Sequence, residues 1–275
     1  MDKPVSKHRQ TVTKGQLEVL NLLFNFRYGT NDLFAAYFGK KDRSFVHKRM
    51  AILLERGLVS RRFDSSYRLH GKPGVYYLTA EGARQLQEAR DVELNVKSIY
   101  KDKDLSEQFV GYSLELLTIY IQLRRHYGDT LGFFTRAILN HEDYEYFPQP
   151  LPNAYMTLKV GGNEKHFFLE TLHDDQPWFV AVRKILQHIK YAEDGDWNET
   201  ELNQPAILLV CESERLAKRV QKRIPKALAD SYDEDTIEFA VTAKSELLGE
   251  KTAIWRTEVD GGQLRLEELD EWTSE

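Results

Sequence analysis

The sequence predicts an α+β or α/β protein of two domains: a small three-helix domain with a β-hairpin, then a larger domain around a mixed β-sheet. Three observations lead to this prediction. The chain has 275 residues, enough for two domains that each bury a core. Three helix-like and two strand-like segments come first. The remainder follows the order helix, three strands, helix, strand, helix, strand, which is typical of helices packed on a sheet.

Composition and cysteine content indicate a globular cytoplasmic protein. Hydrophobic residues make up 41% of the chain and charged residues 29%. The one cysteine, Cys211, excludes an intramolecular disulfide and favours a reducing compartment. The N-terminal segment lacks the apolar run of a signal peptide, and no continuous apolar stretch is long enough to cross a bilayer. We therefore expect a cytoplasmic protein without membrane contact.

The net charge of -5 conceals a strong asymmetry along the chain. Residues 1–80 contain 15 Lys and Arg against 6 Asp and Glu, whereas residues 81–275 contain 23 against 37. A basic block suits a polyanionic partner, and the acidic remainder does not. The charge distribution therefore favours the N-terminal end as the part that contacts nucleic acid.

The N-terminal segment is predicted to form three helices. A first helix is expected over residues 13–26, because apolar residues recur there at helical spacing. Thr30 can cap a second, short helix that Gly39 ends. Asp42 can cap a third helix that ends at Gly57.

The third helix separates apolar side chains on one face from small, polar and cationic ones on the other. The apolar face carries Val46, Met50, Leu53 and Leu54. The opposite face carries Ser44, His47, Lys48 and Ala51, with Arg43 in the first turn. Such an outer face suits insertion into the major groove of DNA, where cations reach guanine or phosphate and Ser or His read base edges. An ordinary amphipathic surface helix would show the same pattern.

The segment after this helix favours the DNA-binding interpretation. LVSRRF (58–63) and VYYLT (75–79) have the composition of strands, and the polar loop between them contains Gly71, Pro73 and Gly74. Two strands after three helices make a wing, and YYLTAEGARQL (76–86) resembles the ending of many winged-helix regulators. We therefore predict a winged helix-turn-helix over residues 10–90 that binds double-stranded DNA. Its expected contacts are Arg43, Ser44, His47, Lys48, Arg61, Arg62, Arg68, His70 and Lys72.

A charged linker over residues 91–104 is expected to precede the second domain, residues 105–260. Its predicted elements are a helix (106–127), three strands (131–139, 154–160 and 165–172), a helix (177–193), a buried strand (205–211), a basic helix (213–224) and strands at 237–243 and 252–257. The acidic segment 261–275 is expected to be a mobile tail.

Two strings of this second domain carry a resemblance to a known family. They resemble the motifs of the replication-relaxation family of plasmids, phages and integrating elements: PNAYMTLKVGGNEKHFFLETL (152–172) and VRKILQHIKYAEDGDW (182–197), followed by PAILLVCESER (205–215). The resemblance implies a winged helix joined to a PD-(D/E)XK nuclease-like domain, and DNA binding connected with replication or transfer of a mobile element.

The nuclease chemistry requires two acidic ligands for a divalent cation and a lysine near the attacking water. Glu170 occupies one acidic position, but Asn153 is neutral and Leu172 stands where the lysine belongs. Lys184 or Lys190 on the following helix can substitute for that lysine. Gln187 and Tyr191 have a Gln-x-x-x-Tyr spacing that some nucleases show on this helix, although a solvated helix edge gives the same pattern. The candidate catalytic residues are therefore Glu170, Lys184, Gln187 and Tyr191.

Three hypotheses follow for the whole chain. The first is a non-enzymatic DNA-binding protein of a mobile element, whose inactive second domain supplies dimerisation or protein-partner contacts. It needs no cofactor and no metal. The second is a DNA nuclease with a migrated active site, which would need Mg²⁺. The third is a transcriptional regulator whose C-terminal domain senses a ligand or a protein.

Overall fold

The computed structural model describes residues 12–63, 67, 69, 71–91, 104–139, 146–200, 202–230, 237–257 and 261–269. It contains two compact units, Met1–Leu117 and Thr118–Glu275. The division falls inside helix α6 (Glu107–Tyr127), whereas the sequence placed a boundary near Asp104. Within the described ranges, no helix combines the length and the apolar character that crossing a bilayer requires.

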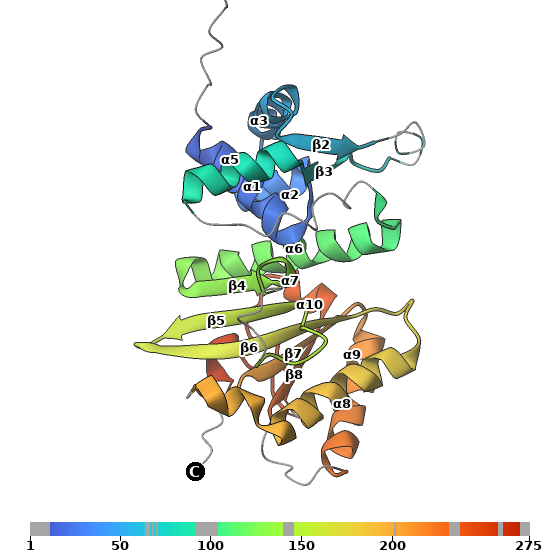
Figure 1. Ribbon diagram of the computed structural model, residues 1–275. Helices are drawn as coiled ribbons and strands as arrows, with labels where there is room; N and C mark the ends of the chain where they lie inside the picture. Colours follow the sequence, from blue (N-terminus) through green and yellow to red (C-terminus); the bar gives the residue numbers. More distant parts are fainter. Residues whose placement is uncertain are drawn as a thin grey trace, which may run out of the picture. The chain divides into compact units, whose positions relative to one another are not determined.

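The first unit places a small antiparallel sheet against helices (Figure 1). Its elements before α6 are α1 (Lys14–Phe26), β1 (Tyr28–Thr30), α2 (Asn31–Tyr37), α3 (Ser44–Glu55), β2 (Val59–Arg62), β3 (Val75–Leu78) and α5 (Ala80–Arg90). The sheet order is β1-β3-β2, so the short strand β1, which the sequence analysis did not predict, completes a three-stranded sheet.

Local hydrogen bonds fix the ends of these helices. The Thr30 side chain accepts from Leu33 N at the start of α2, as its predicted capping role requires. Arg43 is the N-cap residue of α3 and makes no capping hydrogen bond through its side chain. The predicted cap, Asp42, accepts instead from Ser44 N at 2.8 Å. Gly57, at φ 67°, allows the left-handed turn that ends α3.

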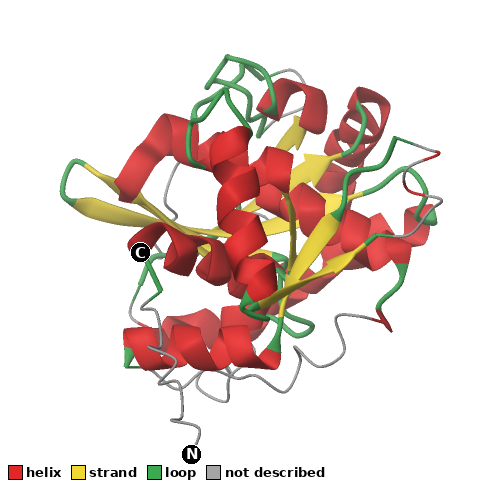
Figure 2. Cartoon of the chain, turned by 90° about the horizontal axis from the view of Figure 1, so that it is seen from above, coloured by secondary structure: helices red, strands yellow, loops and turns green. Residues whose placement is uncertain are grey.

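The second unit contains a five-stranded mixed sheet in the order β4-β5-β6-β7-β8. Its strands are β4 (Leu131–Thr135), β5 (Ala154–Val160), β6 (Asn163–Leu172), β7 (Ala206–Cys211) and β8 (Phe239–Ala243). β4, β5 and β6 pair antiparallel, and β6, β7 and β8 pair parallel. The β5–β6 hairpin turns at Gly161 and Gly162 and projects beyond the other strands (Figures 1 and 2). The predicted mixed-sheet α/β fold class is therefore confirmed for this unit.

Helices α8 (Trp178–Asp194) and α9 (Glu214–Leu228) cover one face of this sheet (Figure 1). Apolar side chains of both helices, such as Ile185 and Val220, pack against Phe168 and Leu209 of the strands. Alternation along β6 sends Phe168, Glu170 and Leu172 toward the same side. Glu170 therefore points into the layer between the sheet and α8.

The structure corrects three expectations for the second unit. The segment predicted as one strand at 131–139 ends at Thr135 and continues as the short helix α7 (Arg136–Leu139). In 252–257, only isolated bridges form at Trp255 and Arg256. The described part of the predicted mobile tail is packed, because Leu266 and Leu269 are fully buried. Burying two leucines outweighs the solvation of the acidic residues around them.

Candidate functional site

The outer face of α3 is the first candidate site. Val46, Met50 and Leu53 are buried, and Leu54 is half-buried, as the predicted apolar face requires. The opposite side, Ser44, His47, Lys48 and Ala51, is exposed. The helix therefore presents a polar and cationic stripe to solvent, with its apolar residues in the core.

Some residues of this stripe already have partners. Arg43 Nε lies 3.0 Å from Asp32 Oδ1, in a pair that is exposed on both sides. His47 Nδ1 lies 3.1 Å from Asn31 Nδ2. Lys48 is exposed and has no ion-pair partner among the described residues. Exposed pairs are worth about 0–1 kcal/mol, so Arg43 can exchange Asp32 for a phosphate at little cost.

The β2–β3 hairpin separates its candidate cations into two groups. Arg61 and Lys72 are exposed, and the Arg61 guanidinium lies 4.8 Å from the centre of the Phe63 ring. Arg62 points inward: it donates to Leu105 O at 2.7 Å and to Glu107 Oε1 at 2.8 Å, with 19% of its side chain exposed. Because Arg62 holds the start of α6, it is not available to DNA as predicted. Arg68 and His70 lie outside the described residues.

Cations ahead of α3 were missed by the sequence analysis. Lys40 and Lys41 are exposed just before the helix, and Lys40 Nζ lies 5.9 Å from the centre of the Phe45 ring. Within α3 itself, the Arg49 guanidinium lies over two aromatic rings, 4.6 Å from the centre of Phe38 and 4.2 Å from the centre of Phe45. Their position directly before the predicted start of the third helix is the sequence feature that could have identified Lys40 and Lys41 as candidate phosphate contacts.

Three oxygen atoms of the second unit surround the ammonium group of Lys184. Its Nζ lies 2.6 Å from Glu170 Oε2, 3.2 Å from Asn153 Oδ1 and 3.1 Å from Thr171 O. On the other side of the carboxylate, His188 Nε2 lies 3.4 Å from Glu170 Oε1. A lysine has three N–H donors, so these three oxygens satisfy all of the donors of Lys184. We call Asn153, Glu170, Thr171, Lys184 and His188 the lysine cluster.

Charge keeps Glu170 ionised although its side chain is almost fully buried. Burial alone would raise its pKa, but the charge of Lys184 and hydrogen bonds from His188 and Lys184 lower the pKa to about 2. His188 is also fully buried, and its Nδ1 has no hydrogen-bond partner in the described part of the chain. His188 was missed by the sequence analysis, although it follows Lys184 by one helical turn and so shares its face.

The lysine cluster does not fit a catalytic divalent cation. Mg²⁺ binds oxygen ligands and usually one or two carboxylates. Here Glu170 is the one carboxylate, Asn153 is neutral, and Lys184 Nζ lies between the oxygens that a cation would use. No group of three His, Cys, Asp or Glu side chains in the described ranges could hold a metal ion. The arrangement balances a buried charge.

The other two catalytic candidates lie outside the lysine cluster. Gln187 Nε2 donates to Pro150 O at 2.8 Å, and the Tyr191 hydroxyl donates to Tyr146 O at 2.8 Å. Both side chains therefore hold the backbone of residues 146–150 against α8. Burial raises the pKa of Tyr191, which removes it further from proton transfer near neutral pH.

Comparison with known proteins gives little beyond these observations. No protein-family model matches the sequence, and no curated protein does either. The chain is similar to the structure of restriction endonuclease FokI, with a TM-score of 0.33, 9% identity, and coverage of 85% of this chain and 42% of FokI. For FokI bound to DNA the TM-score is 0.29 and the identity 11%, with 88% and 44% covered. The chain thus spans less than half the length of FokI, and similarity at this level carries no functional argument.

Proposed function

We propose that this protein binds double-stranded DNA through a winged helix-turn-helix formed by its first unit, and that it acts without catalysis. The outer face of α3 carries the proposal. That face exposes Ser44, His47 and Lys48 on a helix whose opposite side is anchored in the core. Exposed hydroxyl, imidazole and ammonium groups on one helix are the chemistry that reads base edges in a major groove.

The hairpin supplies a second contact in this proposal. Arg61 and Lys72 are exposed on the segment that corresponds to a wing, and Lys40 and Lys41 precede the recognition helix. Phosphate contacts by such cations position a protein on DNA without reading sequence. With about five phosphates neutralised, the logarithm of affinity should fall with the logarithm of salt at a slope of about -4 to -5.

The lysine cluster supports the non-catalytic part of the proposal. Lys184 donates to the same three oxygens that would have to bind a cation, and the site has a single carboxylate. The nuclease hypothesis therefore requires Lys184 to leave a buried ion pair before any metal can enter, which is costly.

We also propose that the DNA belongs to a mobile element. This part rests on the resemblance of residues 152–172 and 182–197 to the replication-relaxation family. A gene neighbourhood of plasmid or phage replication functions is the expected observation. A neighbouring promoter that the protein represses would favour the alternative of a transcriptional regulator with a sensing domain.

The test is duplex binding by the full chain, measured by fluorescence anisotropy at low ionic strength. The binding variant replaces Arg43, Lys48, Arg61 and Lys72 with Ala. The control variant removes the same charge from exposed positions of the second unit, Lys159, Arg183, Lys190 and Lys251. We expect the binding variant to lose affinity steeply and the control to bind as the natural protein does. Equal affinity of the two variants would remove the proposed surface.

A further inference from the structure

Helix α9 carries a cationic face in the acidic part of the chain. Residues 81–275 have 23 Lys and Arg against 37 Asp and Glu, yet α9 itself contains six cations and one acidic residue. Its buried side includes Leu216, Val220 and Ile224. Five exposed cations occupy the opposite side at helical spacing: Arg215, Lys218, Arg219, Lys222 and Lys226. This set, the α9 face, extends over about 16 Å of helix.

Within the described ranges, most cations of the α9 face have no carboxylate partner. Arg215 lies 3.4 Å from Asp174 Oδ1, with 87% of its own side chain exposed. Lys218, Lys222 and Lys226 have no ion-pair partner among the described residues. An amphipathic helix needs only polar side chains on its outer side, so packing does not account for five cations there. Cations concentrated on one face are typical of a surface that binds a polyanion.

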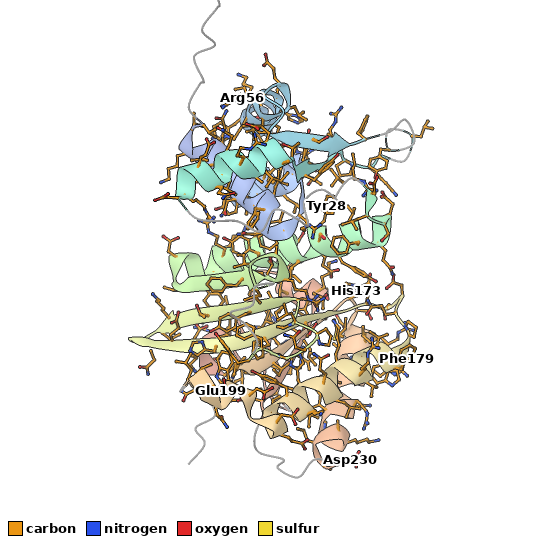
Figure 3. The ribbon with its side chains drawn as sticks, in the orientation of Figure 1. Tyr28, Arg56, His173, Phe179, Glu199 and Asp230 are labelled. Carbon is orange, nitrogen blue, oxygen red and sulfur yellow. The ribbon has the colours of Figure 1, made fainter. Side chains whose placement is uncertain are left out.

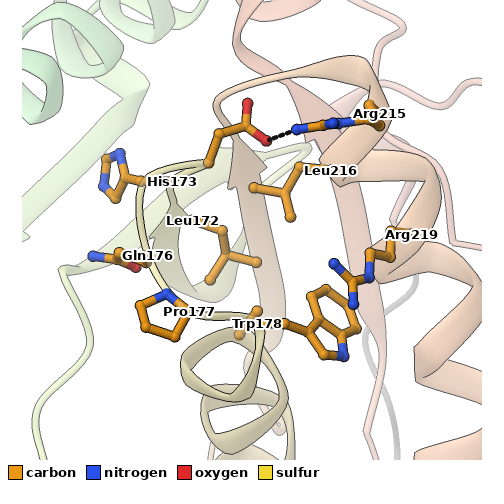
Figure 4. A pocket seen from close by; sticks show the side chains of 10 residues that line it. Leu172, His173, Gln176, Pro177, Trp178, Arg215, Leu216 and Arg219 are labelled. Atoms are coloured by element: carbon orange, nitrogen blue, oxygen red, sulfur yellow. Dashed lines mark hydrogen bonds and ion pairs between the residues drawn. The ribbon is translucent and has the colours of Figure 1, made fainter.

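A pocket opens at the first turns of α8 and α9, beside the α9 face (Figure 4). It has a volume of about 200 Å³. Its apolar wall includes Leu172, Trp178 and Leu216, and its polar rim includes Asp174, Arg215 and Arg219. His173 follows the last residue of β6 and is buried (Figure 3). Arg215 and Arg219 thus belong to both the α9 face and the pocket.

The pocket walls suit a flat ring attached to a negatively charged backbone. The Arg219 guanidinium lies 3.8 Å from the centre of the Trp178 ring, so the rim already stacks a planar cation on an aromatic ring. The start of α8 has no side-chain cap at Pro177, which leaves the positive end of a 17-residue helix at the pocket. Drug-sized ligands fill pockets of about 300–1,000 Å³, so this smaller one has room for a single planar group.

We infer that the α9 face and this pocket bind single-stranded nucleic acid, with phosphates on the cations and one unpaired base against the wall at Trp178. Cationic tracks with aromatic side chains are how sequence-tolerant proteins hold single strands. A duplex keeps its bases stacked and paired, so it cannot place one in a pocket without paying for unpairing. An acidic protein segment would match the cations, but its charged side chains would leave the apolar wall of the pocket without a contact.

The test compares two single-stranded probes on the full chain by fluorescence anisotropy: oligo(dT), and an abasic oligomer with the same number of phosphates. We expect the natural protein to bind oligo(dT) more tightly than the abasic probe, because the base fills the pocket. Equal affinity for the two probes contradicts the pocket assignment and needs no variant that could unfold. Replacement of Trp178 by Ala should abolish the difference between the probes.

The α9 face is tested separately with the variant Lys218→Ala, Lys222→Ala, Lys226→Ala. Each phosphate contact on a single strand contributes about 0.7 to the salt slope, so this variant should flatten the slope by about 2 units. The matched control replaces Lys159, Arg183 and Lys251, which are also exposed, and should keep the slope of the natural protein. An unchanged slope in the α9 variant overturns the inference.

This inference is independent of duplex binding by the first unit. The α9 variant should bind duplex as the natural protein does, and the α3 and hairpin variant should keep its affinity for oligo(dT). Loss of duplex binding in the α9 variant with single-strand binding unchanged would contradict our assignment of α9. Absence of duplex binding in the natural protein would overturn the proposed function alone.

Discussion

Lys184 Nζ lies 2.6 Å from Glu170 Oε2, in an ion pair whose carboxylate side chain is only 2% exposed and whose lysine side chain is 19% exposed. The pair joins strand β6 to helix α8, and Asn153 and Thr171 complete the hydrogen bonds of the ammonium group. The ion pair balances the buried charge of Glu170 in the layer between sheet and helix.

The pair predicts acid sensitivity. The pKa of Glu170 is about 2 in the folded protein against an ordinary 4.5, so the unfolded chain binds the proton more tightly. The resulting stability is present above about pH 4.5 and is lost as the pH falls toward 2, by about 3 kcal/mol in total. Urea unfolding measured across this range should show a weaker pH dependence for Glu170→Gln than for the natural protein. Identical pH dependence would contradict the low pKa.

Removing one partner of the pair should cost more than removing both charges. Lys184→Met removes the cation that pairs with the buried carboxylate, and we expect a loss of about 3–5 kcal/mol in the free energy of unfolding at pH 7. The double variant Glu170→Gln, Lys184→Met should be more stable than Lys184→Met alone. Lys190→Met on the same helix is the control, because that side chain is 73% exposed. Additive losses in the double variant would show that the two charges are not coupled.

The nuclease hypothesis is tested with plasmid DNA. Because Lys184 donates to the oxygens of the lysine cluster, we expect supercoiled plasmid to remain intact with the natural protein in Mg²⁺ or Mn²⁺. Gel electrophoresis over an extended incubation measures this. Cleavage that disappears in Glu170→Ala would establish an active site at the cluster and reverse the proposal.

Replacement of Gly82 is predicted to destabilise the first unit. A Cβ at this position would lie 2.0 Å from the backbone oxygen of Leu58, which cannot move without disturbing β2. We expect Gly82→Ala to destabilise the protein by about 1–3 kcal/mol. Gly111→Ala is the control: it lies in α6 with no atom near its missing Cβ, and should stabilise by about 0.5–1 kcal/mol. Thermal unfolding of both variants is the measurement. If Gly82→Ala stabilised the protein as Gly111→Ala does, helix propensity and not the contact with Leu58 would determine the effect.

Two single variants should separate base reading from phosphate contact. Lys48→Ala is expected to cost about 1–3 kcal/mol on the preferred duplex and to relax the sequence preference, if the ammonium meets a base. Lys72→Ala should weaken binding to all duplexes alike and flatten the salt slope by about one unit. Competition binding with random duplexes at several salt concentrations measures both effects. A Lys72 variant with an unchanged salt slope would place the β2–β3 hairpin away from the DNA backbone.

Features set by neighbours in the chain could be predicted from the sequence. Thr30, Thr79 and Ser213 each accept a hydrogen bond from the backbone three residues later, so the starts of α2, α5 and α9 are encoded locally. The buried and exposed faces of α3 followed from helical periodicity, and the β5–β6 turn from its glycines. The candidate Glu170 came from a short motif, and its direction toward α8 follows from strand alternation.

Contacts between distant segments could not be predicted, because many partners are compatible with one pattern. Nothing near Arg62 in the sequence indicated that Glu107 would take its guanidinium. The acidic composition around Leu266 suggested a free tail, whereas packing of that leucine decided its place.

The sequence alone therefore determined the long helices, most of the strands and the basic N-terminal end, because propensity, capping and charge are local properties. Only the tertiary structure decided that Lys184 would reach Asn153, Glu170 and Thr171 rather than solvent. The reason is that a buried carboxylate must be paired, and which cation pairs it depends on how the helix packs on the sheet.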